Sequence, residues 1–173
     1  MKSTTKTTAF LSLLLICFLV MPMLAQQQIK SAKITFEFLN KGVKGSIAGF
    51  ESQSVIQWDN LEASVLEGSV ATETLDTNNG LRNWSLKSGK YFDKSDHPRI
   101  RYKSSQITAT ASGYTVSGTL TIKGIAKPMT IDFTREGNKL IGKATVFTTD
   151  FDIKIKKKRE DNEVAVRFEF ELE

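Results

Sequence analysis

The chain offers few side chains suited to catalysis. His97 is its one histidine and Cys17 its one cysteine. A serine or cysteine nucleophile of the triad type needs a histidine base, and His97 stands directly before Pro98 with no catalytic motif around it. A structural zinc site needs four ligands, usually cysteine and histidine. We therefore expect no catalytic residue, no metal site and no cofactor, and interpret His97 as a solvent-facing loop residue.

Carboxylates are more numerous, but their spacing is that of a strand surface. Glu169, Glu171 and Glu173 alternate with apolar residues at the C-terminal end, which places them on the wet face of a strand. Two further aspartates flank Phe151. A glycosidase pair needs surroundings that raise the pKa of one carboxyl selectively, and no neighbouring residue type provides them. Catalysis by carboxylates is the less favoured interpretation.

A basic run precedes the last strand: Lys154, Lys156, Lys157, Lys158 and Arg159, followed by Glu160, Asp161 and Glu163. Adjacent charges of both signs are typical of a charged hairpin tip facing water. The alternative is a basic lip that attracts an anionic lipid head group or makes transient contact with a membrane surface. Without the first 25 residues, 22 basic residues face 19 acidic ones, a net charge of +3. This is too mild to indicate a nucleic-acid partner.

Residues 1–25 have the layout of a secretory signal peptide. Lys2 and Lys6 precede an apolar run from Ala9 to Val20, and the small Ala25 predicts cleavage before Gln26. A membrane anchor is the alternative, but the run is shorter than the roughly 20 residues that a span needs. A lipoprotein cysteine would follow a small residue, whereas Ile16 precedes Cys17. We expect a periplasmic or secreted protein whose single domain, residues 26–173, contains no cysteine.

Alternation with a period of two dominates residues 26–173. Apolar side chains recur at every second position between turn signals such as Asn40-Lys41-Gly42 and Glu136-Gly137-Asn138, which is typical of antiparallel hairpins. About eight strands with one dry face must close into a barrel or stack as a sandwich. The pattern leaves both open. The dry-face residues include Ile34, Phe36, Phe38, Tyr114, Val116, Leu120, Ile122, Met129, Ile131, Phe133, Val164, Val166, Phe168, Phe170 and Leu172.

One segment breaks this alternation. Between Asn79 and Lys90 the apolar residues have no period of two, so we expect a short helix of two or three turns across a barrel mouth. Asp76, Thr77 or Asn78 would cap it by accepting free amide hydrogens.

Several motifs in order resemble the YceI-like family of secreted lipocalin-like barrels. They are Ile34-Thr35-Phe36, the stretch Val43 to Phe50, the helix residues Arg82, Asn83, Leu86, Lys87 and Ser88, then Tyr91-Phe92-Asp93, the series Pro98, Ile100, Tyr102 and Ser104, and Leu120 to Pro128. The chain departs from the family pattern at three places. Asn83 replaces a frequent aspartate, Ala32-Lys33 replaces a histidine-serine pair, and Asp152 replaces a common glycine.

The resemblance implies an all-β fold, an antiparallel eight-stranded lipocalin-like β-barrel with one short helix near the barrel mouth. It also implies that the apolar interior holds a long-chain isoprenoid or similar fatty amphiphile, such as a polyprenyl phosphate or a quinone. An eight-stranded barrel has room for one slim ligand. The expected apolar lining is Phe36, Phe38, Trp84, Leu86, Phe92, Ile100, Tyr102, Phe133, Phe168 and Phe170. The alternative is that these side chains simply fill the core.

Three functions follow from this. The first is an exported, non-enzymatic lipid-binding barrel for transport, storage or sequestration. The second is a filled-core structural or stress-related periplasmic barrel that binds a protein partner, and the third is an isomerase or hydrolase acting on a bound lipid. An unfilled tunnel distinguishes the first from the second, and a pair of polar side chains inside it would be needed for the third. In each case Gly124 and Pro128 are expected to be structural residues of a hairpin.

Overall fold

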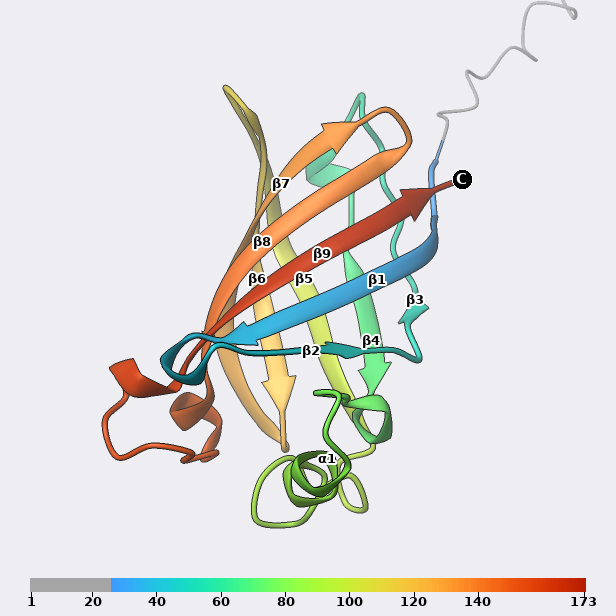
Figure 1. Ribbon diagram of the computed structural model, residues 1–173. Helices are drawn as coiled ribbons and strands as arrows, with labels where there is room; N and C mark the ends of the chain where they lie inside the picture. The colour runs from blue at the N-terminus through green and yellow to red at the C-terminus, as the bar shows by residue number, and fades with distance from the viewer. Residues whose placement is uncertain (1–25) are drawn as a thin grey trace, which may run out of the picture.

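The computed structural model describes residues 26–173, so the expected leader and its cleavage site lie outside the described residues. One antiparallel sheet forms the molecule, with the strand order β2-β1-β9-β8-β7-β6-β5-β4-β3 (Figure 1). The sheet curls so that its apolar face turns inward. The strands are β1 (Ile29–Phe38), β2 (Val43–Ile47), β3 (Glu51–Ser52), β4 (Glu67–Ala71), β5 (Arg99–Thr110), β6 (Gly113–Ile122), β7 (Ile125–Glu136), β8 (Lys139–Phe147) and β9 (Glu163–Leu172).

The period-two alternation decides which side chains enter the core. On β7, Met129, Ile131 and Phe133 are buried while the residues between them are exposed. On β9, Phe170 and Leu172 are buried in the same way. Successive side chains of a strand point to opposite faces, so each of the longer strands contributes one apolar row to a common interior. The predicted all-β barrel-like fold is confirmed.

The structure has nine strands where we expected eight, because β3 is an extra strand of two residues. After Ser52, a backbone bond from the Gln53 amide to the Glu67 carbonyl (2.9 Å) is joined by side-chain bonds. The Ser54 hydroxyl donates to the Glu67 carbonyl (3.0 Å) and accepts from the Glu67 amide (3.0 Å). Such local side-chain bonds compete with the backbone ladder, and the strand ends there.

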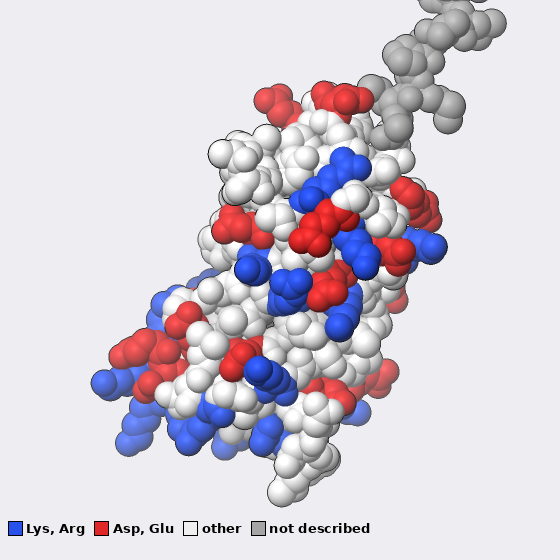
Figure 2. All heavy atoms as spheres, turned by 45° about the horizontal axis from the view of Figure 1, so that its top comes forward, with Lys and Arg blue, Asp and Glu red and all other residues white. Residues whose placement is uncertain are grey.

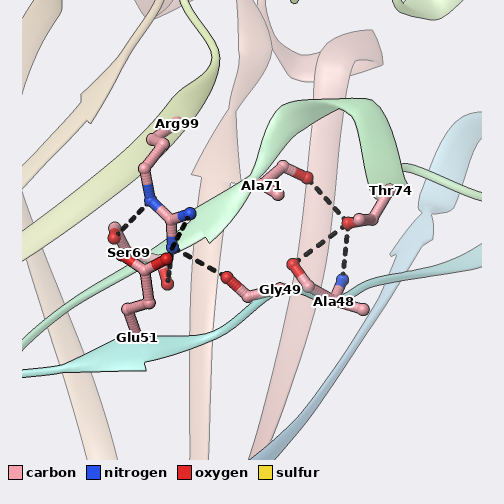
Figure 3. Close-up of polar contacts among 7 residues, drawn as sticks. All are labelled: Ala48, Gly49, Glu51, Ser69, Ala71, Thr74 and Arg99. Carbon is pink, nitrogen blue, oxygen red and sulfur yellow. Dashed lines mark hydrogen bonds and ion pairs between the residues drawn. The ribbon is translucent and has the colours of Figure 1, made fainter.

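The two edges of the sheet are joined without a continuous ladder. Backbone pairs link Ser46 to Asp76 and Gln27 to Ile56, each with hydrogen bonds of 2.8 to 3.0 Å. Between these pairs, Arg99 at the start of β5 reaches across the seam (Figure 3). Its guanidinium donates to the Gly49 carbonyl (2.7 Å) and lies 3.0 Å from a Glu51 carboxylate oxygen.

Thr74 fastens the same seam from the 3₁₀ turn η3 (Thr72–Thr74) that follows β4. Its hydroxyl donates to the Ala71 carbonyl (2.7 Å) and accepts from the Ala48 amide (2.8 Å) (Figure 3). The seam is therefore held by isolated backbone pairs together with side-chain contacts, where the rest of the barrel is held by continuous strand pairing.

The β6–β7 hairpin has the predicted glycine turn. Lys123 and Gly124 both have positive φ, +51° and +72°, which is the two-residue turn whose twist matches the flanking strands. Pro128 lies in β7 before its ladder with β8 begins at Asp132. The missing N–H of proline therefore costs no bond on that side.

Helix α1 (Gly80–Leu86) lies at one end of the barrel, within the expected segment but only seven residues long (Figure 1). Its cap is Asn79, whose side chain accepts from the Arg82 amide (2.9 Å). The caps we expected were wrong because their side chains have other partners or geometry. Asp76 accepts from the Asn78 amide (2.8 Å), Thr77 donates to Asn83 (2.7 Å), and Asn78 has a positive φ of +55°.

The basic run lies, as expected, in the connection of an antiparallel hairpin, between β8 and β9, and Lys157, Lys158 and Arg159 are exposed. The connection is longer than a simple tip. This connection contains the 3₁₀ turns η4 (Thr148–Phe151) and η5 (Glu160–Asn162). The fully buried Asn162 organises it by accepting from the amides of Ile155 and Lys156 (3.0 and 2.8 Å). Ile153 is also fully buried. The loop thus has a core of its own beneath exposed lysines.

Candidate functional site

A cavity of about 380 Å³ runs inside the barrel. Small-ligand sites typically enclose about 300–1,000 Å³. Every strand except the short β3 contributes lining residues, and most of them are aliphatic or aromatic. The lining includes Ile29, Ile34, Val43, Ile47, Phe50, Leu66, Val70, Leu75, Tyr91, Leu120, Ile122, Met129, Ile131, Val146, Ile155, Val164 and Val166.

Eight of the ten residues expected to line the interior do so: Phe36, Phe38, Leu86, Phe92, Ile100, Tyr102, Phe168 and Phe170. Trp84 does not, because it lies on the outer face of α1 with 74% of its surface exposed. Phe133 is buried but lies outside the lining, since its ring packs behind Phe168 and Phe170, with centroids 6.3 and 5.7 Å away.

Two aromatic rings lie flat against the barrel wall over glycines. Phe36 is the cross-strand partner of Gly45, and Phe133 is the partner of Gly142. A Cβ atom at either glycine would collide with the facing ring. The glycines therefore make room for rings that would otherwise project further into the interior. Glycine within a strand often marks such a close approach.

Tyr102 is the one lining residue with a strongly shifted pKa. Its hydroxyl donates to the Val116 carbonyl (3.0 Å) and lies 3.3 Å from the Met129 carbonyl. Burial raises the pKa of Tyr102 to about 12, because the charged phenolate would lose its hydration. The hydroxyl is neutral at any physiological pH and is already engaged with backbone. We interpret Tyr102 as a structural link across the wall.

The end of the barrel farthest from α1 is closed by packing. The Trp58 indole donates to the Gln27 side-chain oxygen (2.6 Å) and packs against Tyr114 at 5.2 Å. The Arg135 guanidinium also lies over the indole, 4.2 Å from the ring centroid. The lining residues nearest this end, such as Ile29 and Leu66, are buried. The cavity therefore does not open here.

The end near α1 has exposed polar residues in its lining. Lys41 follows the β1 strand in the 3₁₀ turn η1 (Leu39–Lys41), and Arg82 lies on α1. Both are exposed. The buried Thr77 and the half-buried Ser85 also line the cavity at this end. We call this end the mouth. The sequence reasoning found Leu86 here but missed Arg82 and Ser85, although positions three or four apart on a helix share a face.

Asn83 attaches α1 to the chain before it. Its side-chain oxygen accepts from the Thr77 amide and hydroxyl (2.8 and 2.7 Å), and its nitrogen donates to Asp76 (2.7 Å). That hydrogen bond from Asn83, followed by the one from the Asn78 amide, lowers the pKa of Asp76. The departure from the family pattern at position 83 thus replaces a carboxylate by an amide that pairs with Asp76.

The β8–β9 connection covers the other side of the mouth. Ile155 points into the cavity from the middle of the basic run. Arg159 donates twice to Asp150 (2.8 and 2.7 Å) and stacks 3.7 Å from the Phe147 centroid. These hydrogen bonds lower the pKa of Asp150. The connection is therefore held by a charge pair outside and by apolar residues inside.

Within residues 26–173, no cluster of three or more His, Cys, Asp and Glu side chains has metal-binding spacing. Among the same residues, no helix has the length and apolar character required to cross a bilayer. His97 is half-buried on the β4–β5 connection, where it lies against Gly124. We had expected it to face open solvent. The site that remains is the apolar cavity.

A curled antiparallel sheet around an apolar cavity defines a barrel of the lipocalin-like class. The model of the YceI-like domain matches residues 26–172, and the chain belongs to the YceI-like family. Curated relatives include a UPF0312 protein of Yersinia enterocolitica, 30% identical over 54% of this chain and 50% of its own length. Another, from Vibrio parahaemolyticus, is 28% identical over 72% of this chain and 73% of its own. The alignments with the first relatives span about half of their length.

Solved structures share the fold at low sequence identity. BcnA of Burkholderia cenocepacia aligns over 82% of this chain and 96% of its own, with a TM-score of 0.68 and 19% identity. A polyisoprenoid binding domain from Saccharophagus degradans, implicated in plant cell wall breakdown, aligns over 86% of this chain and 97% of its own, with a TM-score of 0.51 and 11% identity. At these identities the likeness establishes the fold alone.

Proposed function

We propose that the protein binds a long isoprenoid or similar amphiphile with its apolar chain inside the barrel, for transport, storage or sequestration outside the cytoplasm. The observation that carries this proposal is the cavity of about 380 Å³ with an apolar lining and a polar mouth. The polyisoprenoid binding domain among its structural neighbours supports the choice of ligand class. Burial of each methylene contributes about 0.8 kcal/mol.

The cavity favours this function over the two alternatives. A filled-core barrel would leave no such space between its side chains. An enzyme would need free polar groups deep inside, whereas the polar side chains of Lys41, Arg82 and Ser85 lie at the mouth. The lining hydroxyls of Ser54, Tyr102 and Thr148 bond to the carbonyls of Glu67, Val116 and Ile153. The family is a binding-protein family, which agrees with a non-enzymatic role.

The direct test combines extraction with a pair of variants. Mass spectrometry of organic extracts from the natively purified protein should detect a long-chain amphiphile. Phe168→Trp should then reduce uptake of a fluorescent isoprenoid with little change in thermal unfolding, because Phe168 is a half-buried lining residue. Thr119→Trp, on the outward face of β6, is the matched control and should bind normally. Absence of lipid from the parent, together with severe destabilisation by Phe168→Trp, would indicate a filled barrel.

Export is a separate part of the proposal and has its own test. The basic start, apolar run and small Ala25 support cleavage before Gln26. N-terminal sequencing of the protein from the exporting cell should begin at Gln26. An intact Met1 or a lipid-modified Cys17 would contradict it.

A further inference from the structure

Exposed apolar side chains concentrate at the mouth. Among residues 26–173, three large hydrophobic side chains are exposed: Leu39 (45%), Leu81 (79%) and Trp84 (74%). Leu81 and Trp84 are three residues apart and share the outer face of α1. Leu39 lies in η1, two residues before the lining residue Lys41. A monomeric soluble surface has little reason to gather its largest apolar residues beside one opening.

Basic residues lie on the same end. Lys156, Lys157 and Lys158 belong to the β8–β9 connection, which a hydrogen bond from Asn40 to Asp161 (3.0 Å) joins to η1. Within the described part of the chain, no ion pair involves these three lysines. Figure 2 shows Lys and Arg gathered at the lower left, with Asp and Glu among them, where Figure 1 has this connection.

The opposite end has the reverse character. Its connections, residues 53–66, 111–112 and 137–138, contain Asp59 and Glu62 but no lysine or arginine. Its tryptophan, Trp58, is held by Gln27, Tyr114 and Arg135. Among the described residues, the exposed large apolar side chains therefore lie at the mouth, and the connections of that end carry a basic run that the distal connections lack.

We propose that the mouth docks on the surface of a bilayer that contains anionic phospholipid. The docking face consists of Leu39, Leu81, Trp84 and the lysines Lys156–Lys158. Trp84 and Leu81 enter the interface between head groups and acyl chains, where tryptophan is favoured. The lysines stay at the head groups. Docked in this way, the cavity opens toward the lipid, so a chain moves between bilayer and barrel without crossing water. The choice of a bilayer rests on this charge complementarity, and the transfer step rests on the proposed lipid-binding function.

Sedimentation with vesicles tests the docking itself. The protein should bind vesicles of phosphatidylcholine with phosphatidylglycerol and bind pure phosphatidylcholine weakly, and added salt should weaken binding. Replacing Lys156, Lys157 and Lys158 with Ala should reduce binding by roughly 100-fold at low salt, at about five-fold per lysine. The matched control variant replaces Lys33, Lys139 and Lys143, which lie on the barrel wall, with Ala. This variant should bind vesicles like the parent. Equal losses in both triple variants would overturn the docking face.

Fluorescence then locates the contact. The double variant Leu81→Ser with Trp84→Ser should lose vesicle binding by about ten-fold or more. Brominated phospholipid should quench the parent, and this quenching should disappear in Trp84→Phe, because Trp58 is at the far end. A parent that binds no vesicles but dimerises in sedimentation velocity, with the dimer lost in Trp84→Ser, would overturn the proposal in favour of a second copy of this chain.

A last comparison separates docking from ligand binding. Isoprenoid delivered from cyclodextrin should enter the parent and the Leu81→Ser, Trp84→Ser variant equally, since neither residue lines the cavity. Transfer from anionic vesicles should be slower in the variant only. Failure of both proteins to take up isoprenoid from cyclodextrin would contradict the proposed function and leave the sedimentation result to decide docking.

Discussion

The two ends of the barrel are built by different means from the same strands. At the distal end, two of the three connections are two-residue turns, and Trp58 closes the interior between Gln27, Tyr114 and Arg135. At the mouth, the connections 72–98 and 148–162 are long and carry a helix, 3₁₀ turns and many side-chain hydrogen bonds. The strands provide the wall, and the connections decide which end opens.

Because the two ends are built differently, we expect changes at the distal end to affect stability and changes at the mouth to affect the position of α1. Distal residues hold one another by close apolar packing, so a change there alters the fold. Around α1 at the mouth, residues are held by hydrogen bonds among Asp76, Thr77 and Asn83. A change there alters the position of α1 with a smaller cost to the barrel. The following variants test that division.

The largest expected effect is the loss of an aromatic ring from the packed half. Phe133→Ala removes the ring that packs on Phe168 and Phe170 and covers Gly142. We expect a loss of about 3–5 kcal/mol in the free energy of unfolding, measured with urea. Phe92→Ala, at the half-buried mouth, is the comparison and should cost less. Equal costs would show that the two ends are packed alike.

A smaller loss of stability is expected when a substitution places a second carboxylate beside Asp76 at the mouth. Asn83→Asp removes the hydrogen bond to Asp76 and places a second negative charge beside it. The lowered pKa of Asp76 stabilises the native state above its ordinary pKa, and this contribution is lost as the pH falls through the lowered value. The variant should therefore melt lower at neutral pH and approach the parent in acid.

The second substitution Asp76→Asn supplies the control for this pair. In the Asn83→Asp background it restores one amide and one carboxylate, so the melting temperature should recover. Hydrogen exchange should show the same pattern in α1 with little change in β6 and β7. The role of this pair would not be local if Asn83→Asp left the melting temperature unchanged, or if it lowered hydrogen-exchange protection throughout the barrel.

Tyr102 lies between the two ends and gives a smaller effect. Tyr102→Phe removes a hydroxyl bound to the Val116 carbonyl, at a cost of about 1 kcal/mol. Because its pKa is raised to about 12, the native state favours the neutral phenol. Its contribution is present below the ordinary pKa and is lost as the pH rises from about 10 toward 12.

Phenolate absorbance measures this directly. The parent should show a component titrating near pH 12 that is missing in Tyr102→Phe. If that component titrates near the ordinary value of about 10 instead, the hydroxyl is hydrated and part of an open, polar cavity wall. Tyr102 would then belong with the polar residues of the mouth and not with the packed wall.

Much of the wall could be predicted from the sequence, because strand periodicity depends only on which residues are apolar. Rows such as Met129, Ile131 and Phe133 are buried as expected. The strand count differed because Glu51 and Ser52 pair with β4 as a separate strand, and a segment of two residues is too short to show a period of two. The seam held by Arg99 was likewise not foreseen, since it joins residues 50 positions apart.

The site was less predictable than the wall. Trp84 was wrongly expected to line the cavity. The sequence of a short helix with apolar residues on several sides does not indicate which side is buried. Phe133 is buried as expected, but it packs against Phe168 and Phe170 and does not reach the cavity. Strand periodicity does not predict which buried side chains line a cavity. Ile155 was missed because it sits among lysines, and its burial depends on the bonds that Asn162 makes to the loop.

The smallest expected effect concerns Asp152, which occupies a position where the family resemblance has glycine. Its φ is +56°, a left-handed conformation that disfavours a side chain, and its exposed ion pair with Lys154 (3.1 Å) contributes little. Asp152→Gly should therefore raise the melting temperature slightly, within about 2 °C. Asp152→Ala loses the same ion pair but keeps a Cβ atom at positive φ, so it should lower the melting temperature. Equal decreases in both variants would show that the ion pair with Lys154, and not the backbone, sets the stability of this connection at the mouth.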